Sequence, residues 1–156
     1  MWIDINDIKR WKPVVEKVVG GLEWIGFSKF KTEKLLCISS QKITIIDCDN
    51  GNIIETDADY DEENYIAFCD ALPDEEICIS GQYGGKMEYS TSYGDKVIIE
   101  TSPEYISTVI FMSESEKEHV IFNDYGFYTC GFSYDGKYFV FSQDAGITIL
   151  KRGYTL

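Results

Sequence analysis

The chain has 156 residues, 44% of them hydrophobic and 15% aromatic, which is enough apolar material for a core of its own. We expect a single domain over residues 1–156. The formal net charge of −13 at pH 7 creates a field that repels phosphate groups. This charge argues against nucleic acid and anionic membranes as partners and favours a basic protein, although acidity also serves solubility.

Residues 1–21 carry the only helical pattern in the sequence. Apolar side chains recur there at intervals of three and four, at Ile5, Ile8, Trp11, Val15 and Val18 or Val19. The spacing predicts an amphipathic helix that packs on a sheet. Pro13 is expected to kink this helix or to begin a second one, and Gly20-Gly21 is expected to end it.

From Leu22 onward the sequence changes to short runs of Ile, Val, Phe, Tyr and Thr between glycine-containing turns, which predicts an antiparallel β meander. Some runs, such as residues 138–141, are apolar without alternation, which is typical of strands covered on both faces. The candidate strands are Trp24 to Phe30, Lys34 to Ser40, Ile43 to Asp47, Ile53 to Thr56, Tyr65 to Cys69, Glu76 to Ser80, Lys86 to Tyr89, Lys96 to Thr101, Ser107 to Met112, His119 to Asn123, Phe127 to Phe132, Lys137 to Ser142 and Gly146 to Lys151.

The meander contains an internal repeat. The triplet Gly-Phe-Ser at residues 26–28 and again at 131–133 is followed each time by a lysine and two apolar runs, and weaker copies begin near residues 67 and 109. A spacing of this order is typical of propeller blades. Residues 131–149 resemble the first three strands of a blade in tryptophan-aspartate-repeat and related β-propellers, and residues 45–54 resemble the turn between the third and fourth strands.

The Trp-Asp and Gly-His marks of that family are absent from this sequence. Propellers use about four to eight blades, and the repeat here supplies three or four units beginning near residues 26, 67, 109 and 131. We therefore expect an open, propeller-like set of blade-like sheets or a sandwich, with the N-terminal helical segment covering an edge or a face.

No motif for catalysis, a metal or a cofactor is evident. His119 is the only histidine, which excludes a zinc site with several imidazoles and severely limits a catalytic triad. Asp47, Asp49 and Asn50 offer clustered oxygen atoms, but the terminal glutamate of a calcium loop is missing and a hairpin turn explains them. Carboxylates are too abundant for any pair to be singled out as a glycosidase acid and base. We expect no enzyme, no metal and no cofactor.

The five cysteines lie mostly within apolar runs and are odd in number. Reduced, buried thiols are expected. The start of the sequence shows no basic region followed by an apolar run, and no stretch approaches the roughly 18 apolar residues of a membrane span. These features lead us to expect a cytoplasmic protein.

The densest charge lies in the middle of the chain. An acidic run with interspersed tyrosines predicts a face that binds a basic partner, since tyrosine offers large contact area at low entropic cost. A solvated loop between strands is the alternative. The predicted partner-binding residues are Asp57, Asp59, Asp61, Glu62, Glu63, Asp70, Asp74, Glu75, Glu76, Tyr60 and Tyr83.

A small, acidic, single-domain protein without catalytic residues resembles in type the immunity proteins that bacteria keep beside their toxins. The two share no motif. The resemblance implies that the protein neutralises a basic toxin, such as a nuclease, by occluding it. The alternative is a propeller-like scaffold or regulatory module that holds another protein or a peptide strand. An enzyme comes third.

Overall fold

The computed structural model describes residues 2–6, 8–114 and 117–153, which form fifteen strands. No helix that could cross a membrane occurs in these ranges. The strands are β1 (Trp11–Val18), β2 (Leu22–Phe27), β3 (Lys34–Ser39), β4 (Ile43–Asp47), β5 (Ile53–Glu55), β6 (Ala58–Asp61), β7 (Ile66–Cys69), β8 (Leu72–Cys78), β9 (Ser80–Gly81), β10 (Lys96–Thr101), β11 (Ser107–Met112), β12 (Glu118–Asp124), β13 (Phe127–Phe132), β14 (Tyr138–Gln143) and β15 (Gly146–Arg152).

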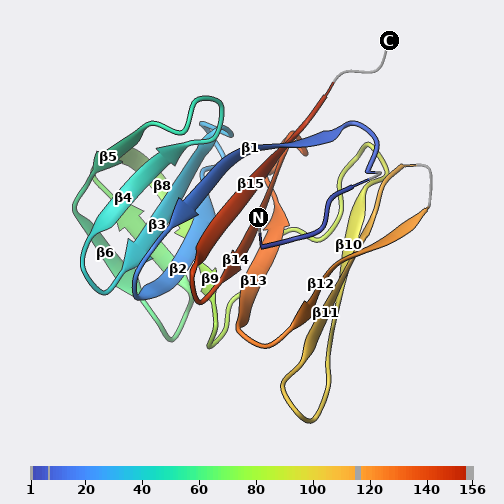
Figure 1. The fold of residues 1–156 in the computed structure, drawn as a ribbon. Coiled ribbons are helices and arrows are strands. Elements are labelled where there is room, and N and C mark those ends of the chain that lie inside the picture. The colour runs from blue at the N-terminus through green and yellow to red at the C-terminus, as the bar shows by residue number, and fades with distance from the viewer. Residues whose placement is uncertain (1, 7, 115–116, 154–156) are drawn as a thin grey trace.

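The strands form four antiparallel sheets. We call β1-β15-β14-β13 the terminal sheet, β5-β4-β3-β2-β9 the large sheet, β6-β7-β8 the acidic sheet and β10-β11-β12 the hairpin sheet. The terminal sheet lies between the large sheet and the hairpin sheet (Figure 1). Among the described residues the four sheets close into neither a barrel nor a propeller. The predicted antiparallel, mainly β fold is confirmed.

The N-terminal segment is a strand, so the predicted helix is wrong. β1 pairs with β15 along its whole length, and the pairing shifts between Pro13 and Val15. Pro13 has no amide hydrogen, and a proline is tolerated here because β1 is at the edge of its sheet. Trp11 is buried whereas Val18 is exposed, so the apolar residues do not share one face. Residues 1 and 7 of the predicted helix lie outside the described residues.

Further segments differ from the predicted strands. β8 runs from Leu72 to Cys78, whereas the predicted strand runs from Glu76 to Ser80. β6 lies within the run that was expected to be an acidic loop or binding face, and its carboxylates alternate with Ala58 and Tyr60 along a strand. The predicted strand Lys86 to Tyr89 is reduced to an isolated bridge of Glu88 with Phe132, and Ser90 just after it forms another with Lys96.

Three apolar clusters hold the sheets together, one between each pair of packed sheets. They join the hairpin and terminal sheets, the terminal and large sheets, and the large and acidic sheets. β14 is buried along its whole length because its sheet is covered on both faces. The continuous apolar run in its sequence predicts such a strand. Buried members of the three clusters are Phe111 and Phe139, Leu35 and Val140, and Leu36 and Ala67.

The two Gly-Phe-Ser triplets begin in β2 and β13, which occupy corresponding places in the large and terminal sheets. Both glycines permit close approach of neighbouring chain. A Cβ atom at Gly26 would lie 2.3 Å from the carbonyl oxygen of Cys78, and one at Gly131 would lie 2.3 Å from Cβ of Met87. Larger residues at either position would push neighbouring segments apart.

A buried ion network joins β1 and β15 to the hairpin sheet. Asp95, which precedes β10, accepts hydrogen bonds from Nε of Arg152 at 3.0 Å and from the indole nitrogen of Trp11 at 3.4 Å. Arg152 also donates to Glu114 at 2.6 Å, and Glu114 pairs with Arg10 as well. The two buried charges of Asp95 and Arg152 are tolerated because each has the other as its partner.

Candidate functional site

All but one of the predicted partner-binding residues belong to the acidic sheet or to the segments beside it. Tyr83 is the exception, because it lies in the turn after β9 and is highly exposed. The others are distributed as follows: Asp57 before β6; Asp59, Tyr60 and Asp61 in β6; Glu62 and Glu63 in the β6–β7 turn; Asp70 in the β7–β8 turn; and Asp74, Glu75 and Glu76 in β8.

Strand alternation gives the acidic sheet an apolar inner face and an outer face with an aromatic centre. Ala67 and Ile77 are buried against the large sheet. Phe68 points the other way and keeps 47% of its surface exposed. The register places Asp59 directly opposite Phe68 on β6. Aromatic residues, phenylalanine included, are enriched at protein interfaces relative to the rest of a protein surface.

A shallow depression beside Phe68 extends this outer face towards β8. Its volume is about 360 Å³, and Asp74 and Glu76, both exposed, contribute to its lining together with Phe68. Phe68 therefore lies between carboxylates of both neighbouring strands. Sequence reasoning missed it, although its place between the buried residues Ala67 and Cys69 is a signal of an outward-facing side chain.

Two of the predicted acidic residues are engaged within the fold. Glu75 accepts hydrogen bonds from Oγ of Ser28 at 2.7 Å and from the backbone nitrogen of Lys29 at 3.0 Å, so it ties β8 to the large sheet. Asp61 accepts a hydrogen bond of 2.7 Å from the side chain of Asn64, which with backbone donors of the same turn lowers the pKa of its carboxyl group. These two residues are less available to a partner than Asp59, Asp74 and Glu76.

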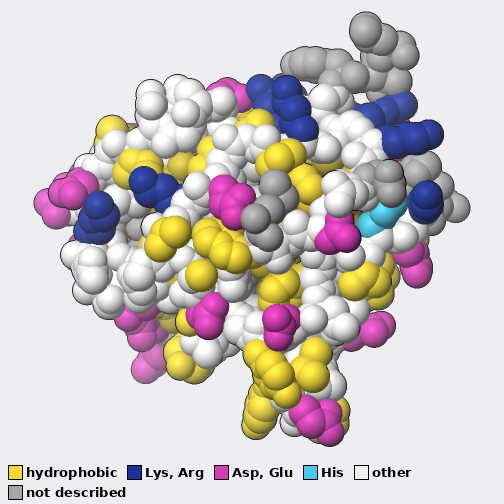
Figure 2. All heavy atoms as spheres, in the orientation of Figure 1, with side chains coloured by type: hydrophobic (Ala, Val, Ile, Leu, Met, Phe, Trp, Pro, Cys, Tyr) yellow, Lys and Arg dark blue, Asp and Glu magenta, His cyan; other side chains and the backbone are white. Residues whose placement is uncertain are grey.

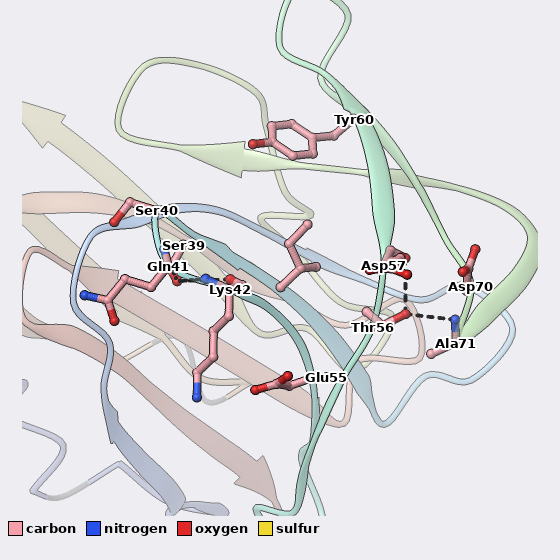
Figure 3. A pocket seen from close by; sticks show the side chains of 11 residues that line it. Ser39, Ser40, Gln41, Lys42, Glu55, Thr56, Asp57, Tyr60, Asp70 and Ala71 are labelled. Carbon is pink, nitrogen blue, oxygen red and sulfur yellow. Dashed lines mark hydrogen bonds between the residues drawn. The ribbon is translucent and has the colours of Figure 1, made fainter.

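A polar groove of about 760 Å³ borders the other edge of the acidic sheet. Tyr60, Asp57 and Asp70 line it from the acidic sheet, and the β3–β4 turn at residues 39–42 lines it from the large sheet. Figure 3 shows Tyr60 and this turn on opposite sides of the open space, with Glu55 at its lower end. The groove residues from the large sheet could not be inferred from the sequence, because only the fold brings them here.

One end of the groove is held by a hydrogen bond, and Tyr60 lines the groove with a protonated hydroxyl group. Oγ1 of Thr56 accepts a hydrogen bond from the backbone nitrogen of Ala71 at 3.1 Å, which holds the β5–β6 connection against the β7–β8 turn. Partial burial, with the nearby carboxylates of Glu23 and Glu62, raises the pKa of Tyr60. Its phenol therefore stays neutral at physiological pH and offers a hydrogen-bond donor to a ligand in the groove.

Two carboxylates at the β4–β5 turn form ion pairs with lysines. Asp47 pairs with Lys34 at 2.8 Å, and Asp49 pairs with Lys151 at 2.7 Å and accepts a hydrogen bond from Tyr138. The structure thus agrees with the interpretation of this segment as a turn. In the ranges that the structure describes, no group of three or more His, Cys, Asp or Glu side chains could hold a metal ion.

The cysteines are free thiols, and four of the five are buried as predicted. Burial raises the pKa of Cys37 to about 11 and also raises the pKa values of Cys48, Cys69 and Cys130. Their thiols are therefore protonated and poorly reactive at neutral pH. Cys78 is the exception, because it is exposed on β8.

Charge is unevenly spread over the surface. In the view of Figure 2, lysine and arginine side chains lie mainly towards the upper right, with others on the left, whereas aspartate and glutamate are scattered over most of this face. The acidic sheet lies on the left in the same orientation (Figure 1). The densest run of carboxylates in the sequence, within residues 57–63, lies in or beside that sheet.

No protein-family model matches the chain, and no curated protein has a significantly similar sequence. The outer face of the acidic sheet and the adjoining groove therefore define the candidate site by their geometry and charge.

Proposed function

We propose that the protein is a non-catalytic binding domain whose acidic sheet docks on a basic protein. The observation that carries the proposal is the outer face of this sheet, where Phe68 is exposed between Asp59 on one strand and Asp74 and Glu76 on another. The aromatic ring would supply contact area that excludes water, and the surrounding carboxylates would supply orientation and fast association.

The role that suits such a surface best is that of an immunity protein acting in the cytoplasm on a cognate bacterial toxin. A nuclease binds its substrate through a basic surface, and an acidic sheet presents to that surface the same sign of charge as a phosphate backbone. Occlusion of the substrate site would then inhibit the toxin without any chemical step. The net charge of −13 would speed the encounter by electrostatic steering.

The alternative function is that of a scaffold or regulatory module. The corresponding positions of the two Gly-Phe-Ser triplets in the large and terminal sheets support it, because repeated blade-like sheets are a common platform for binding proteins and peptides. The two functions differ in what happens to the partner. An immunity protein abolishes its partner's activity, whereas a scaffold leaves it unchanged.

The test compares two variants with the same change in net charge. In the first, Asp59→Asn, Glu62→Gln, Asp74→Asn and Glu76→Gln neutralise the acidic sheet while Glu75 and Asp61 are kept. In the control, Glu100→Gln, Glu104→Gln, Glu118→Gln and Asp124→Asn neutralise exposed residues of the hairpin sheet. Association with the partner captured from the native host is measured by surface plasmon resonance at several salt concentrations.

The acidic-sheet variant is expected to associate about tenfold more slowly and to lose most of its salt dependence, while the control keeps both. Phe68→Ala is expected to speed dissociation, since truncating a central aromatic anchor costs about 2 kcal/mol. Equal effects of the two charge variants would show that only net charge matters and would contradict the proposed face. If the captured partner is an enzyme that stays fully active when saturated with the protein, the immunity function is contradicted and the scaffold function is favoured.

A further inference from the structure

The hairpin sheet has an edge that the chain covers only in part. The backbone nitrogen of Val97 in β10 donates to the carbonyl oxygen of Tyr89 at 2.9 Å, so the backbone groups of Val97 point away from β11. Successive residues of a strand point their backbone groups to opposite sides, and β10 pairs with β11 in unbroken register. The amide and carbonyl groups of Ile99 and Thr101 therefore point outward as well.

These outward groups have no backbone partner among the described residues. The segment that ends at Ser90 bridges to Lys96 and covers β10 as far as Val97, but at Glu88 it turns to bridge to β13 instead. The uncovered part of β10 borders a groove of about 510 Å³, which is also lined by residues of β9 and β13. Phe127, Tyr128 and Ile99 give this groove apolar and aromatic walls.

Three other edge strands carry features that protect a sheet edge against pairing. β6 has alternating aspartates, β1 has Pro13, and β12 is contacted by the N-terminal segment, where the backbone nitrogen of Asp4 donates to the carbonyl oxygen of Ile121 at 2.8 Å. The uncovered part of β10 has none of these devices and begins with Ile98 and Ile99. An apolar edge left bare in this way is a template for another strand.

We propose that this edge binds an extended segment of a partner protein, which adds as a strand beside Ile99 and Thr101. The chain's own Tyr89 pairs with the same edge one step earlier, so the incoming segment continues a pairing that the fold already uses. Alternate side chains of the segment would enter the groove and should be apolar. The others should be basic or neutral, because Glu100 is exposed there and the chain carries a charge of −13.

A second copy of this chain fits the edge less well. Pairing two copies would bring together two chains that each carry a net charge of −13, with the exposed Glu100 on both edges. A neutral or basic segment meets no such repulsion. The proposal concerns a different sheet from the acidic face and holds whether or not that face binds a basic protein.

The experiment uses an array of ten-residue peptides in which valine, isoleucine or tyrosine alternates with lysine, threonine or serine. Each peptide that binds is remade in two forms, N-methylated at every odd or at every even position. Only one of the two forms removes the amide groups that face β10, so that form should bind about tenfold more weakly or worse, whereas the other should bind like the parent. Bound peptide should also slow hydrogen exchange of the Ile99 and Thr101 amides.

Three results would overturn the proposal. They are the absence of any binding peptide in the array, equal loss of binding in the two N-methylated forms, and unchanged exchange at Ile99 and Thr101 in the complex. Concentration-dependent protection of the same amides without peptide would show that a second copy occupies the edge instead. The acidic-sheet variant should bind the peptides unchanged, so failure of the docking face proposed above and failure of this edge are separate outcomes.

Discussion

At the scale of single residues, Asp95 is a buried carboxylate that several distant groups contact. It is 1% exposed, and besides Arg152 and Trp11 it accepts a hydrogen bond of 3.1 Å from the backbone nitrogen of Glu114. One carboxylate thus connects β1, β15 and the segment after β11. Its removal would leave Arg152 buried and sharing Glu114 with Arg10 among the described residues.

We predict that Asp95→Ala lowers the free energy of unfolding by about 3 kcal/mol, because Arg152 stays buried and must share the carboxylate of Glu114 with Arg10. The melting temperature should fall by roughly 6–12 °C for a domain of this size. Glu104→Ala, in the exposed turn between β10 and β11, is the control and should change stability by less than about 0.5 kcal/mol. Both are measured by thermal and urea unfolding. A stable Asp95→Ala variant would show that Glu114 alone can compensate Arg152.

At the scale of strands, the two repeated glycines set how closely neighbouring segments approach. We predict that Gly26→Ala destabilises the protein by about 2–3 kcal/mol, since the new Cβ would lie 2.3 Å from a backbone oxygen that belongs to β8. Gly20→Ala is the matched control, because nothing lies within 4 Å of its Cβ position. Urea unfolding of both variants measures the difference. Equal stabilities would mean that β2 and β8 can separate without cost.

Most strands predicted from Leu22 onward match the structure, as at β3, β4, β10, β11 and β13 to β15, because local pattern and burial agree there. β1 could not be predicted, since Pro13 and the spacing of its apolar residues indicate a helix and only the distant β15 stabilises the strand. β6 was missed because Asp59 and Asp61 give it the composition of a loop. The acidic residues of the candidate site were predictable from charge, but Phe68 and the groove depend on how sheets pack.

At the scale of the whole molecule, the cysteines report on each interface between sheets. The cluster between the hairpin and terminal sheets contains Cys130, and the cluster between the terminal and large sheets contains Cys37 and Cys48. The cluster between the large and acidic sheets contains Cys69, and Cys78 lies outside all three. We predict that one thiol reacts with a thiol reagent in the native protein and five react after denaturation. Cys69 should react next as urea is added, because the acidic sheet has three strands and crowded like charges. Mass spectrometry identifies the labelled residue, and Cys130 reacting before Cys69 would contradict this order.

The pairing of β1 with β15 affects how the chain folds. Trp11 pairs with Arg152, so the terminal sheet is completed only after nearly the whole described chain is available. Contacts so distant in sequence raise the contact order and slow the folding of a β protein. During synthesis on the ribosome the large sheet can form early. Trp11 and the rest of β1 stay unpaired until β15 has been synthesised. The emerging chain therefore passes through an interval in which chaperones have an unpaired strand to shield.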